Sequence, residues 1–463
     1  MFFRKFTIVL LILAAMASLT FPHRLLAQPT LRQRVDEQVQ PYLDEKIAVG
    51  MTVGIYQRGQ SHAFGFGSTG RPEGSVPDGK TVYEIGSITK VFTGVLLADA
   101  VNRKLIDLDQ PVQDLLPEGT SIPSKDGHPV LVRHLATHTS GLPRLPANMA
   151  PADAENPYAD YSQEQLFQFL NQCQLSRAPG EASEYSNFAV GLLGQLLANQ
   201  SKGSYGTLLK QRIAQPLAMN DSSIELTDSQ RPRLAQPHDA AGNPVKNWDF
   251  QALVGAGGIR STVDDMLLFA KANIAPPKSE MGDALELAWK IQQPPLTKDA
   301  FAMGLGWHIA RDGSTRWHNG QTGGYHSMIL VNRELDTAVV VLANSASMEI
   351  DRLAEDLMRL VAGATVKPRT FEETKKVAPE IMRRYVGRYE LVPGFVLTVS
   401  VVGDRLMVGA TGQPAAEVFA KTDTEWFYKV VKATITFKPD DQGQCQELEL
   451  FQNGARHVAK RIE

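Results

Sequence analysis

Apolar and polar positions along this chain repeat with two different periods, and these periods predict where helices and strands lie. Helical spacing runs through residues 31–47, 91–105, 162–173, 188–198 and 352–362. Alternating or short apolar runs predict strands at residues 51–56, 61–66, 304–307, 327–331 and 338–342. A region rich in loops and scattered helices, about residues 111–276, lies between the two groups of strands. We therefore expect one sheet built from both ends, a mostly helical insertion between them, and a groove where the two parts meet.

A change of composition near residue 366 predicts a second domain. Residues 366–378 contain Pro, Thr, Glu and Lys without apolar periodicity, which is typical of a linker. Beyond it, short alternating runs recur about every ten residues, a spacing that predicts a small all-β domain over residues 379–463. The runs are 396–401, 405–408, 424–428, 434–437 and 447–450. This domain carries no obvious catalytic grouping, and the sequence does not identify its partner.

The first 27 residues have the pattern of a secretory signal peptide. Arg4 and Lys5 precede an apolar run over residues 6–19, and the small residue Ala27 closes the segment. The apolar run is shorter than the roughly 20 residues that span a bilayer, which favours cleavage after Ala27 over the alternative of a retained anchor. No later stretch has the length and apolarity of a membrane span. We expect an exported, periplasmic or secreted protein whose domains occupy residues 28–365 and 379–463.

Composition excludes some classes of function. A chain of 463 residues has room for about two or three compact units. The net charge of −3 offers no electrostatic reason to expect a nucleic-acid partner. The two cysteines, Cys173 and Cys445, lie too far apart in the sequence to indicate a disulfide framework or a metal cluster.

The first candidate for chemistry is a serine with a lysine three residues later, Ser87 and Lys90. They lie at the start of the predicted helix over 91–105, which we expect to be amphipathic, and a spacing of three puts both side chains on one helical face. A serine hydroxyl is a poor nucleophile until a base takes its proton. A lysine can act as that base if burial and the helix N-terminus lower its pKa. The pair alone is a pattern that chance also produces.

The second candidate is the run Tyr185-Ser186-Asn187, between a Pro-Gly turn and a predicted helix. A phenol and a carboxamide two residues apart can point into one cavity, where the phenol carries a proton and the amide holds a substrate carbonyl. The alternative is a surface turn in which Asn187 caps the helix.

The third candidate is the run 318–327, which begins His-Asn-Gly-Gln and leads into a strand. Its glycines allow close approach of a ligand to the backbone. An edge strand here could bind substrate by strand addition and direct a backbone N–H toward an oxyanion. The alternative is a glycine-rich hairpin with incidental histidines.

In this order and spacing the three groups resemble the motifs S-x-x-K, Y-x-N and [KH]-x-G of the penicillin-recognising serine hydrolases. That family includes class C β-lactamases, D-Ala-D-Ala carboxypeptidases and related esterases. Further runs that fit it are 133–142, 216–219 and 257–262. The resemblance implies an α+β fold of the β-lactamase/transpeptidase type, an antiparallel sheet flanked by helices, over residues 28–365. The run 385–389 resembles the start of a β domain often fused to such hydrolases.

The resemblance also implies catalytic roles. Ser87 would be the acylated nucleophile, Lys90 its base or electrostatic activator, and Tyr185 the second proton carrier. Asn187 would orient the substrate amide.

The remaining substrate-binding residues lie in the third motif. Gly320 would keep the strand accessible, and the backbone N–H groups of Gln321 and Ser87 would form the oxyanion hole. His318 stands where β-lactamases commonly carry a lysine. Because histidine is charged only in part near neutral pH, we expect affinity for a substrate carboxylate to decline as pH rises through the imidazole pKa.

The sequence thus predicts a serine hydrolase that forms an acyl-enzyme on Ser87 with D-amino-acid peptides of cell-wall type or β-lactams and then hydrolyses it. Two alternatives stay open: a carboxylesterase acting on small acyl esters, and a penicillin-binding sensor or scaffold with little turnover. No metal or organic cofactor is implied. His134 and His138 are four residues apart, as metal ligands can be, but no glutamate lies between them and no third ligand is evident.

Overall fold

The computed structural model describes residues 29–462 apart from positions 73, 372, 373, 404, 412, 414, 430 and 453. The predicted signal peptide, residues 1–27, lies outside the described residues. The helices are α1 (Leu31–Asp44), α2 (Thr89–Asn102), α3 (Val132–Ala136), α4 (Gln163–Gln172), α5 (Asn187–Gln200), α6 (Tyr205–Leu209), α7 (Val254–Gly257), α8 (Val263–Ile274), α9 (Glu280–Trp289), α10 (Glu349–Val361) and α11 (Pro379–Tyr385). Short helical turns are η1 (Gly86–Ile88), η2 (Val112–Leu115), η3 (Lys210–Ala214) and η4 (Arg231–Arg233).

The strands form a large sheet, a two-stranded sheet and a closed barrel. The first nine are β1 (Gly50–Gln57), β2 (Gln60–Gly67), β3 (Val82–Glu84), β4 (Arg260–Thr262), β5 (Ala302–Met303), β6 (His308–Ile309), β7 (Thr315–Gln321), β8 (His326–Asn332) and β9 (Thr337–Ala343). The barrel strands are β10 (Gly387–Val392), β11 (Phe395–Val402), β12 (Arg405–Ala410), β13 (Ala416–Ala420), β14 (Glu425–Tyr428), β15 (Ala433–Pro439), β16 (Cys445–Gln452) and β17 (Ala455–Arg461).

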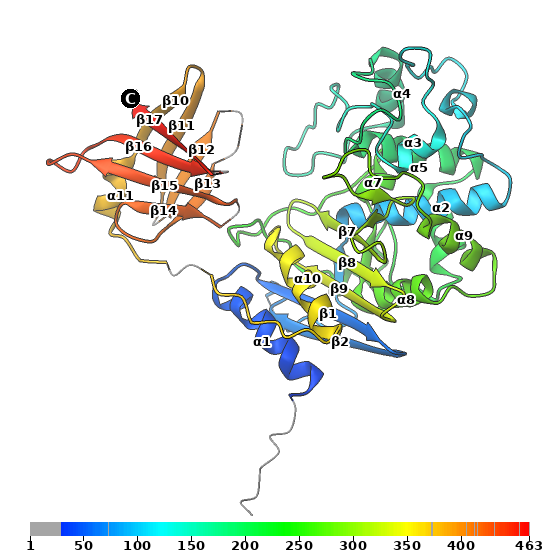
Figure 1. Cartoon of the computed structure of the whole chain (residues 1–463), viewed down its shortest axis with the longest axis horizontal. Helices are drawn as coiled ribbons and strands as arrows, with labels where there is room; N and C mark the ends of the chain where they lie inside the picture. Colours follow the sequence, from blue (N-terminus) through cyan, green and yellow to red (C-terminus); the bar gives the residue numbers. More distant parts are fainter. Residues whose placement is uncertain are drawn as a thin grey trace, which may run out of the picture.

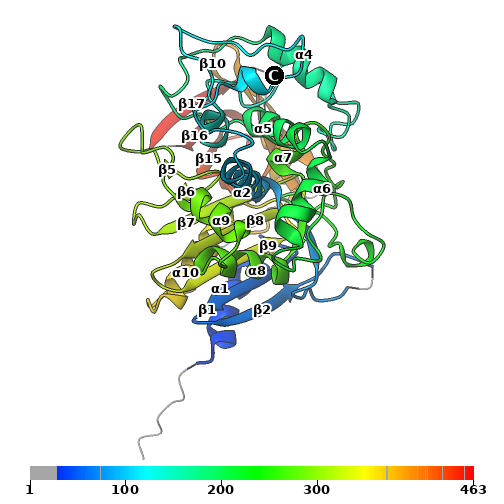
Figure 2. The same ribbon diagram turned by 90° about the vertical axis from the view of Figure 1, so that its right-hand side faces the viewer.

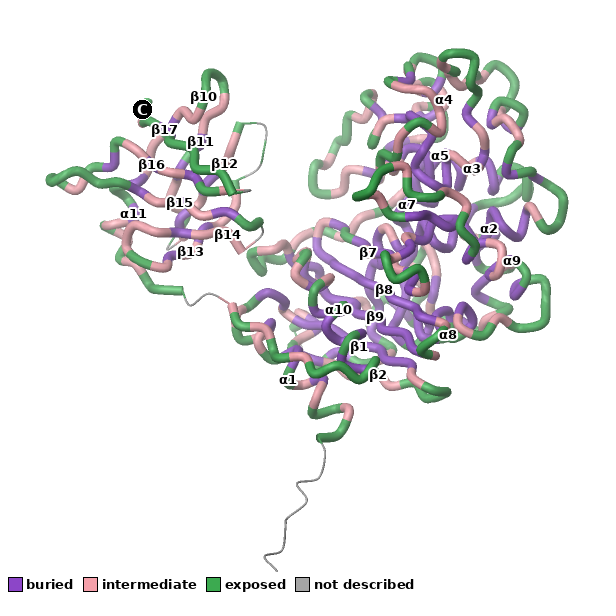
Figure 3. Tube along the Cα trace, viewed as in Figure 1, coloured by how far each residue is buried: buried purple, intermediate pink, exposed green. Residues whose placement is uncertain are grey.

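The large sheet joins the two ends of the predicted sheet region, as expected. Its order is β2-β1-β9-β8-β7-β6-β5, and its neighbouring strands are antiparallel. Helices cover both of its faces, α1 and α10 on one and α8 on the other (Figures 1 and 2). The central strands are therefore buried throughout (Figure 3), which explains why β8 and β9 are nearly continuous apolar runs.

Alternation along β9 divides the interior into two cores. Val340 and Leu342 belong to the core that includes α8 and the helical insertion. Val339 and Val341 point the other way, into the core shared with α1 and α10. A period of two sends successive side chains to opposite faces, so one strand serves both cores.

The short two-stranded sheet β3–β4 brings together the segments that precede and follow most of the helical insertion. Glu84, the last residue of β3, pairs with Arg260 of β4, and the Ile85 amide donates to the Ile259 carbonyl at 3.1 Å. Both ends of the insertion thus meet directly before η1 and α2. This junction fixes where α2 begins.

Helix α2 differs from its prediction because it is not amphipathic. Residues 89–100 of this helix are all buried. The helix is enclosed by α5, α7 and α9, and a helix that is surrounded on all sides needs no polar face.

The predicted strand over residues 304–307 is also wrong. These residues form a bend between β5 and β6. Gly306 has a φ of +74°, and a Cβ there would lie 2.3 Å from the Lys90 carbonyl oxygen. The alternation of glycine with larger residues reflects this close approach to α2, which only glycine permits.

The C-terminal domain is an eight-stranded closed barrel, in agreement with the all-β prediction. It has its own apolar core and follows the N-terminal domain after a segment, residues 362–378, in which the described positions carry no helix or strand (Figure 1). The alternation does not predict strands β10, β13 and β17, because few of their residues are buried and the apolar pattern is therefore weak. The exact domain limits stay a prediction.

Among the described residues, Lys429 and Arg405 make polar contacts between the barrel and the N-terminal domain. Lys429 donates to the carbonyl of Glu45 at 3.1 Å and pairs with its carboxylate at 3.3 Å. Arg405 donates to Asn243 Oδ1 at 3.4 Å. In the part of the chain that the structure describes, every helix is too short or too polar to cross a bilayer.

We expect Phe269→Ala to lower the free energy of unfolding of the N-terminal domain by about 3–5 kcal/mol. Phe269 of α8 is fully buried and stacks on Phe92 of α2 with ring centroids 4.2 Å apart. Leu268→Ala, at a neighbouring position that is 39% exposed, should change it by less than about 1 kcal/mol. Of the five tryptophans only Trp426 lies in the barrel, so urea unfolding followed by tryptophan fluorescence measures the effect. Equal changes in the free energy of unfolding for the two variants would contradict the packing of Phe269 on Phe92.

Candidate active site

The turn η1 carries Ser87 between β3 and α2. Gly86, before it, has a φ of +49°, and a Cβ there would lie 2.7 Å from the Gln321 backbone nitrogen. Only glycine combines that conformation with that contact. Ser87 is therefore held at the surface where η1 meets the end of β7.

Ser87 and Lys90 lie together, as their spacing predicted. Lys90 Nζ is 2.8 Å from Ser87 Oγ and donates to the Ala256 carbonyl at 2.7 Å. The lysine is 1% exposed, and burial, followed by the positive charge of Arg144, places its pKa well below the ordinary value of 10.5. Neither of these two partners is a carboxylate that would hold a proton on the amine. A neutral amine at this distance can accept the serine proton.

Tyr185 completes a group of three side chains around Ser87. Its ring centroid is 4.8 Å from Lys90 Nζ, and its hydroxyl is close enough to the Ser87 side chain to interact with it. Burial raises the pKa of Tyr185, although Ser87 and the charge of Arg144 lower it. The phenol is thus protonated near neutral pH and can give its proton to a departing group.

The loop before α5 is held by the segment that follows α3. The Ser186 amide donates to His138 Nδ1 at 3.2 Å, and Ser186 Oγ donates to the Pro143 carbonyl at 2.6 Å. The His138 ring lies 4.4 Å from the Tyr185 ring. Ser186 also caps α5 by accepting from the Ala189 amide, so the predicted alternative of an Asn187 cap is wrong.

Asn187, the first residue of α5, has an unused acceptor. Its side chain lies near Tyr158 and lowers the pKa of that phenol, while its buried Oδ1 has no hydrogen-bond partner within the described chain. Its backbone amide donates to the Arg144 carbonyl at 3.0 Å. An unpaired buried carbonyl oxygen is costly unless something else pairs with it, and a substrate N–H would do so.

Strand β7 brings the third motif to Ser87. A Cβ at Gly320 would lie 2.0 Å from the Ile85 carbonyl oxygen and 2.9 Å from the Ser87 backbone nitrogen. Ser327 of β8 donates to the same Ile85 carbonyl at 2.8 Å. The backbone nitrogens of Ser87 and Gln321 therefore lie on either side of this close contact between η1 and β7, and their role as oxyanion donors stays a prediction.

The expected edge strand is a partial one. β7 lies between β8 and β6, but β6 pairs only with Arg316 and Trp317. From His318 onward β7 has a strand neighbour on the β8 side alone. On the β6 side, the strand pairing of β7 therefore stops where the motif begins. The main-chain groups on that side are available for strand addition.

His318 contradicts the charge that we expected of it. The imidazole is fully buried, and burial, followed by His308 and Lys90, lowers its pKa well below 6.5. Its Nδ1 bonds the Asn319 carbonyl at 2.5 Å, and its Nε2 has no partner among the residues described. The prediction that His318 is partly charged near neutral pH is therefore wrong, and carboxylate affinity should not follow its titration between about pH 5 and 8.

A network that the sequence did not reveal supports the end of β7. His326 Nδ1 lies 2.9 Å from Gln321 Oε1, and its Nε2 lies 2.7 Å from Asp351 Oδ1 on α10. Asn319 donates to the other Asp351 oxygen at 2.7 Å. These bonds tie both neighbours of Gly320 to the sheet and to α10. Asp351 lies 25 residues after His326 in the sequence, and no local pattern connects them.

Other residues named in the sequence play structural parts. His134 Nδ1 accepts from the Leu131 amide at 3.1 Å, and His308 packs against Trp317 with ring centroids 4.5 Å apart. No cluster of three or more His, Cys, Asp or Glu side chains suited to a metal occurs in the described ranges.

Comparison with known proteins matches both parts of the chain to families. Residues 35–363 match the beta-lactamase family, and residues 372–459 match a domain of unknown function, DUF3471. The chain is 30% identical over 368 residues to the D-alanyl-D-alanine-carboxypeptidase/endopeptidase AmpH of Escherichia coli K12, covering 74% of this chain and 93% of that enzyme. It is 31% identical over 298 residues to a beta-lactamase of Yersinia enterocolitica, covering 63% and 73% of the two chains.

A solved structure has the same fold. The beta-lactamase/D-alanine carboxypeptidase of Yersinia pestis superposes with a TM-score of 0.63 at 25% identity, covering 72% of this chain and 97% of that one.

We expect Lys90→Arg to lower kcat/KM for a neutral ester by about 10²–10⁴-fold, because arginine stays protonated. In the unmodified protein kcat/KM should rise with pH as Lys90 loses its proton, and should level off well below pH 10.5 since the pKa is lowered. The arginine variant should lose that rise. Lys104→Arg, an exposed exchange just beyond α2, is the control. A rise centred near pH 10.5 would contradict a buried neutral amine.

We expect Gly320→Ala to lower kcat/KM at least about 100-fold, because the added methyl would separate β7 from η1 and displace the Ser87 amide. Gly203→Ala is the matched control, since a Cβ there meets only Ser201, no closer than 3.7 Å. Circular dichroism checks that both variants fold. Full activity of folded Gly320→Ala would refute the close contact.

Proposed function

This chain belongs to the beta-lactamase family of serine hydrolases, and we propose that it is an exported enzyme that forms an acyl-enzyme on Ser87 and hydrolyses it. The proposed substrates are peptides ending in D-amino acids and β-lactams. The observation that carries the proposal is the 2.8 Å contact between Ser87 Oγ and the buried amine of Lys90.

Acylation begins at Ser87 Oγ. The neutral amine of Lys90 accepts the serine proton as the oxygen attacks the substrate carbonyl carbon. The negative charge that develops on the carbonyl oxygen is stabilised by the backbone N–H groups of Ser87 and Gln321, each worth about 3 kcal/mol in donors of this kind.

The leaving group then needs a proton. Tyr185 is protonated and in contact with Ser87, so its hydroxyl can give its proton to the departing nitrogen or oxygen. Lys90 returns the serine proton to the phenol, which restores the starting protonation. Water takes the place of the leaving group in deacylation, and the same groups carry its proton in the reverse direction.

Substrate placement is proposed for Asn187, His318 and Gly320. The free Oδ1 of Asn187 accepts a substrate N–H, and the open end of β7 pairs with the substrate backbone beside Gly320. His318 contributes as a neutral, buried hydrogen-bonding group rather than as a cation.

Small acyl esters are the second candidate substrate class. The specific observation that favours them is the neutral state of His318, because the position offers no positive charge to a substrate carboxylate. Export rests on the sequence of residues 1–27, and the partner of the barrel stays unassigned.

The test compares the protein with Ser87→Ala on a penicillin, a D-Ala-D-Ala peptide and a p-nitrophenyl ester. We expect D-alanine release from the peptide and a penicilloyl mass increase on the protein, and we expect the variant to lose turnover by at least about a thousandfold and to gain no mass. Product analysis and intact mass spectrometry measure both.

The outcomes separate the alternatives. A stable penicilloyl adduct without release of any product would indicate the sensor or scaffold. Turnover of the ester alone would indicate the carboxylesterase. Turnover that survives in Ser87→Ala would remove Ser87 from the mechanism.

A further inference from the structure

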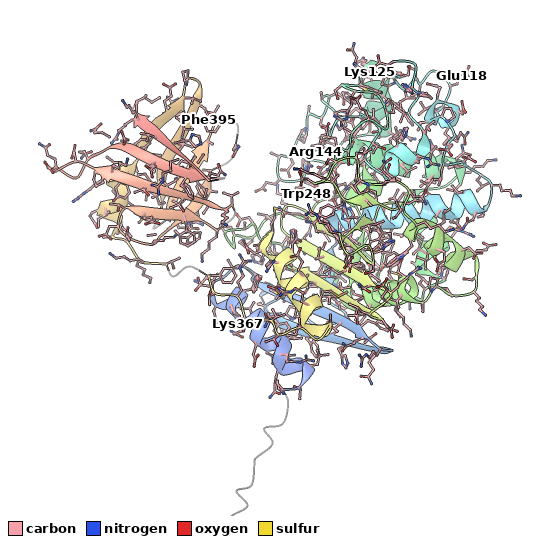
Figure 4. All side chains as sticks on the ribbon, in the orientation of Figure 1. Glu118, Lys125, Arg144, Trp248, Lys367 and Phe395 are labelled. Carbon is pink, nitrogen blue, oxygen red and sulfur yellow. The ribbon has the colours of Figure 1, made fainter. Side chains whose placement is uncertain are left out.

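Arg144 places an exposed positive charge beside the catalytic phenol. The guanidinium carbon lies 5.1 Å from the centroid of the Tyr185 ring, and the residue is exposed to solvent. The same charge contributes to the lowered pKa of both Lys90 and His138, which supports its position within electrostatic range of the site. Figure 4 shows Arg144, with Trp248, on the side of the hydrolase domain that faces the barrel.

The backbone of Arg144 is fixed although its side chain is free. Its carbonyl accepts from the amides of Asn187 and Phe188 at 3.0 and 3.2 Å, and the preceding Pro143 carbonyl accepts from Ser186. The base of the side chain is therefore set by the residues that follow Tyr185. The guanidinium itself must still be ordered when it binds a ligand, which limits the affinity that it can add.

Arg144 forms no ion pair with any carboxylate of the described chain, whereas acidic residues of nearby segments are paired elsewhere. Glu184, directly before Tyr185, pairs with Arg177 at 2.6 Å. Asp153, in the same loop as Arg144, pairs with Lys246 at 2.8 Å. The charge of Arg144 is thus available to an anion that enters the site.

The charge at Arg144 gains importance because His318 is neutral. The third motif supplies no cation at the position where β-lactamases commonly carry lysine. We propose that Arg144 is a specificity-determining residue that binds a substrate carboxylate carried on the leaving group. This inference rests on the function proposed above.

The position of Tyr185 indicates that the carboxylate bound by Arg144 belongs to the leaving group. Tyr185 gives its proton to the departing atom, so that atom lies next to the Tyr185 hydroxyl. A carboxylate a few bonds farther along the leaving group then comes within reach of the guanidinium beside the Tyr185 ring. A terminal D-amino acid has this arrangement, with its carboxylate two bonds from the departing nitrogen. Guanidinium groups bind carboxylates through two parallel hydrogen bonds.

The test uses two pairs of aryl esters. The first pair shares one N-acylglycyl group and differs in the leaving phenol, which carries a 3-carboxylate or a 3-carboxamide. The second pair has phenol as the leaving group and carries a carboxylate or a carboxamide at the end of a glutaryl group. For each pair the measured quantity is the ratio of kcat/KM for the anionic ester to that for the neutral one. The two esters of a pair differ in intrinsic reactivity, but this difference is the same for every protein and cancels when the ratio of a variant is divided by that of the unmodified protein.

We expect Arg144→Gln to lower the first ratio roughly fivefold, the upper range for an exposed ion pair, and to leave the second ratio unchanged. For Arg144→Lys the first ratio should lie between those of the unmodified protein and of Arg144→Gln. Lysine retains the positive charge but lacks the planar guanidinium that binds a carboxylate with two hydrogen bonds. Sodium chloride at 0.5 M should lower the first ratio of the unmodified protein by screening. Arg352→Gln, which removes a half-exposed charge from α10, is the control for net charge.

An unchanged first ratio in Arg144→Gln, or an equal fall in both ratios, would overturn the proposal. Ser87→Ala separates this failure from that of the proposed function. If Ser87→Ala abolishes hydrolysis of all four esters while Arg144→Gln has no effect on the ratios, only the role of Arg144 is lost. If hydrolysis survives Ser87→Ala, the catalytic assignment itself fails.

Discussion

The burial of the Lys90 amine against Ser87 is the interaction on which the proposed active site depends. Removing an ammonium ion from water costs several kcal/mol unless a carboxylate compensates it, and the amine instead contacts a hydroxyl and a carbonyl. The amine therefore favours its neutral form, which is the form that can accept a proton. This arrangement requires a helix enclosed on every side, and α2, buried from residue 89 to residue 100, meets that requirement. Burial of the lysine therefore lowers the stability of the fold at this position, and it provides a neutral amine that can act as a base.

Close backbone contacts hold the other groups in place around this helix. Gly86 and Gly320 let η1 and β7 approach until no side-chain atom fits between them. The β3–β4 pair joins the two ends of the insertion directly before Ser87. The sheet thus supplies a rigid reference for the main-chain donors, while the loop after α3 positions Tyr185 and Asn187 through hydrogen bonds to their neighbours. A reaction that depends on distances near 3 Å benefits from such a framework.

The distribution of charge in the site differs from that of a site built around a lysine in the third motif. His318 is buried and His308 is partly buried, with the pKa of His308 lowered to about 4, so both rings are neutral in the proposed substrate site. The remaining positive charge lies at the exposed Arg144, on the insertion rather than on the sheet. Recognition of an anion would then come from a flexible side chain in solvent, which favours modest affinity and strong dependence on salt.

The sequence by itself determined the elements that local periodicity controls and the chemistry that short spacing controls. It predicted the central strands, α1, α4, α5 and α10, the all-β tail, and the shared helical face of Ser87 and Lys90, because each depends on residues only a few positions apart. Only the tertiary structure decided that α2 is buried on all sides, that residues 304–307 bend around it, and that Asp351 supports Gln321 through His326. It also decided the charge state of His318 and the position of Arg144 over Tyr185. Burial and contacts between distant segments set these properties, and neither quantity is encoded in the spacing of neighbouring residues.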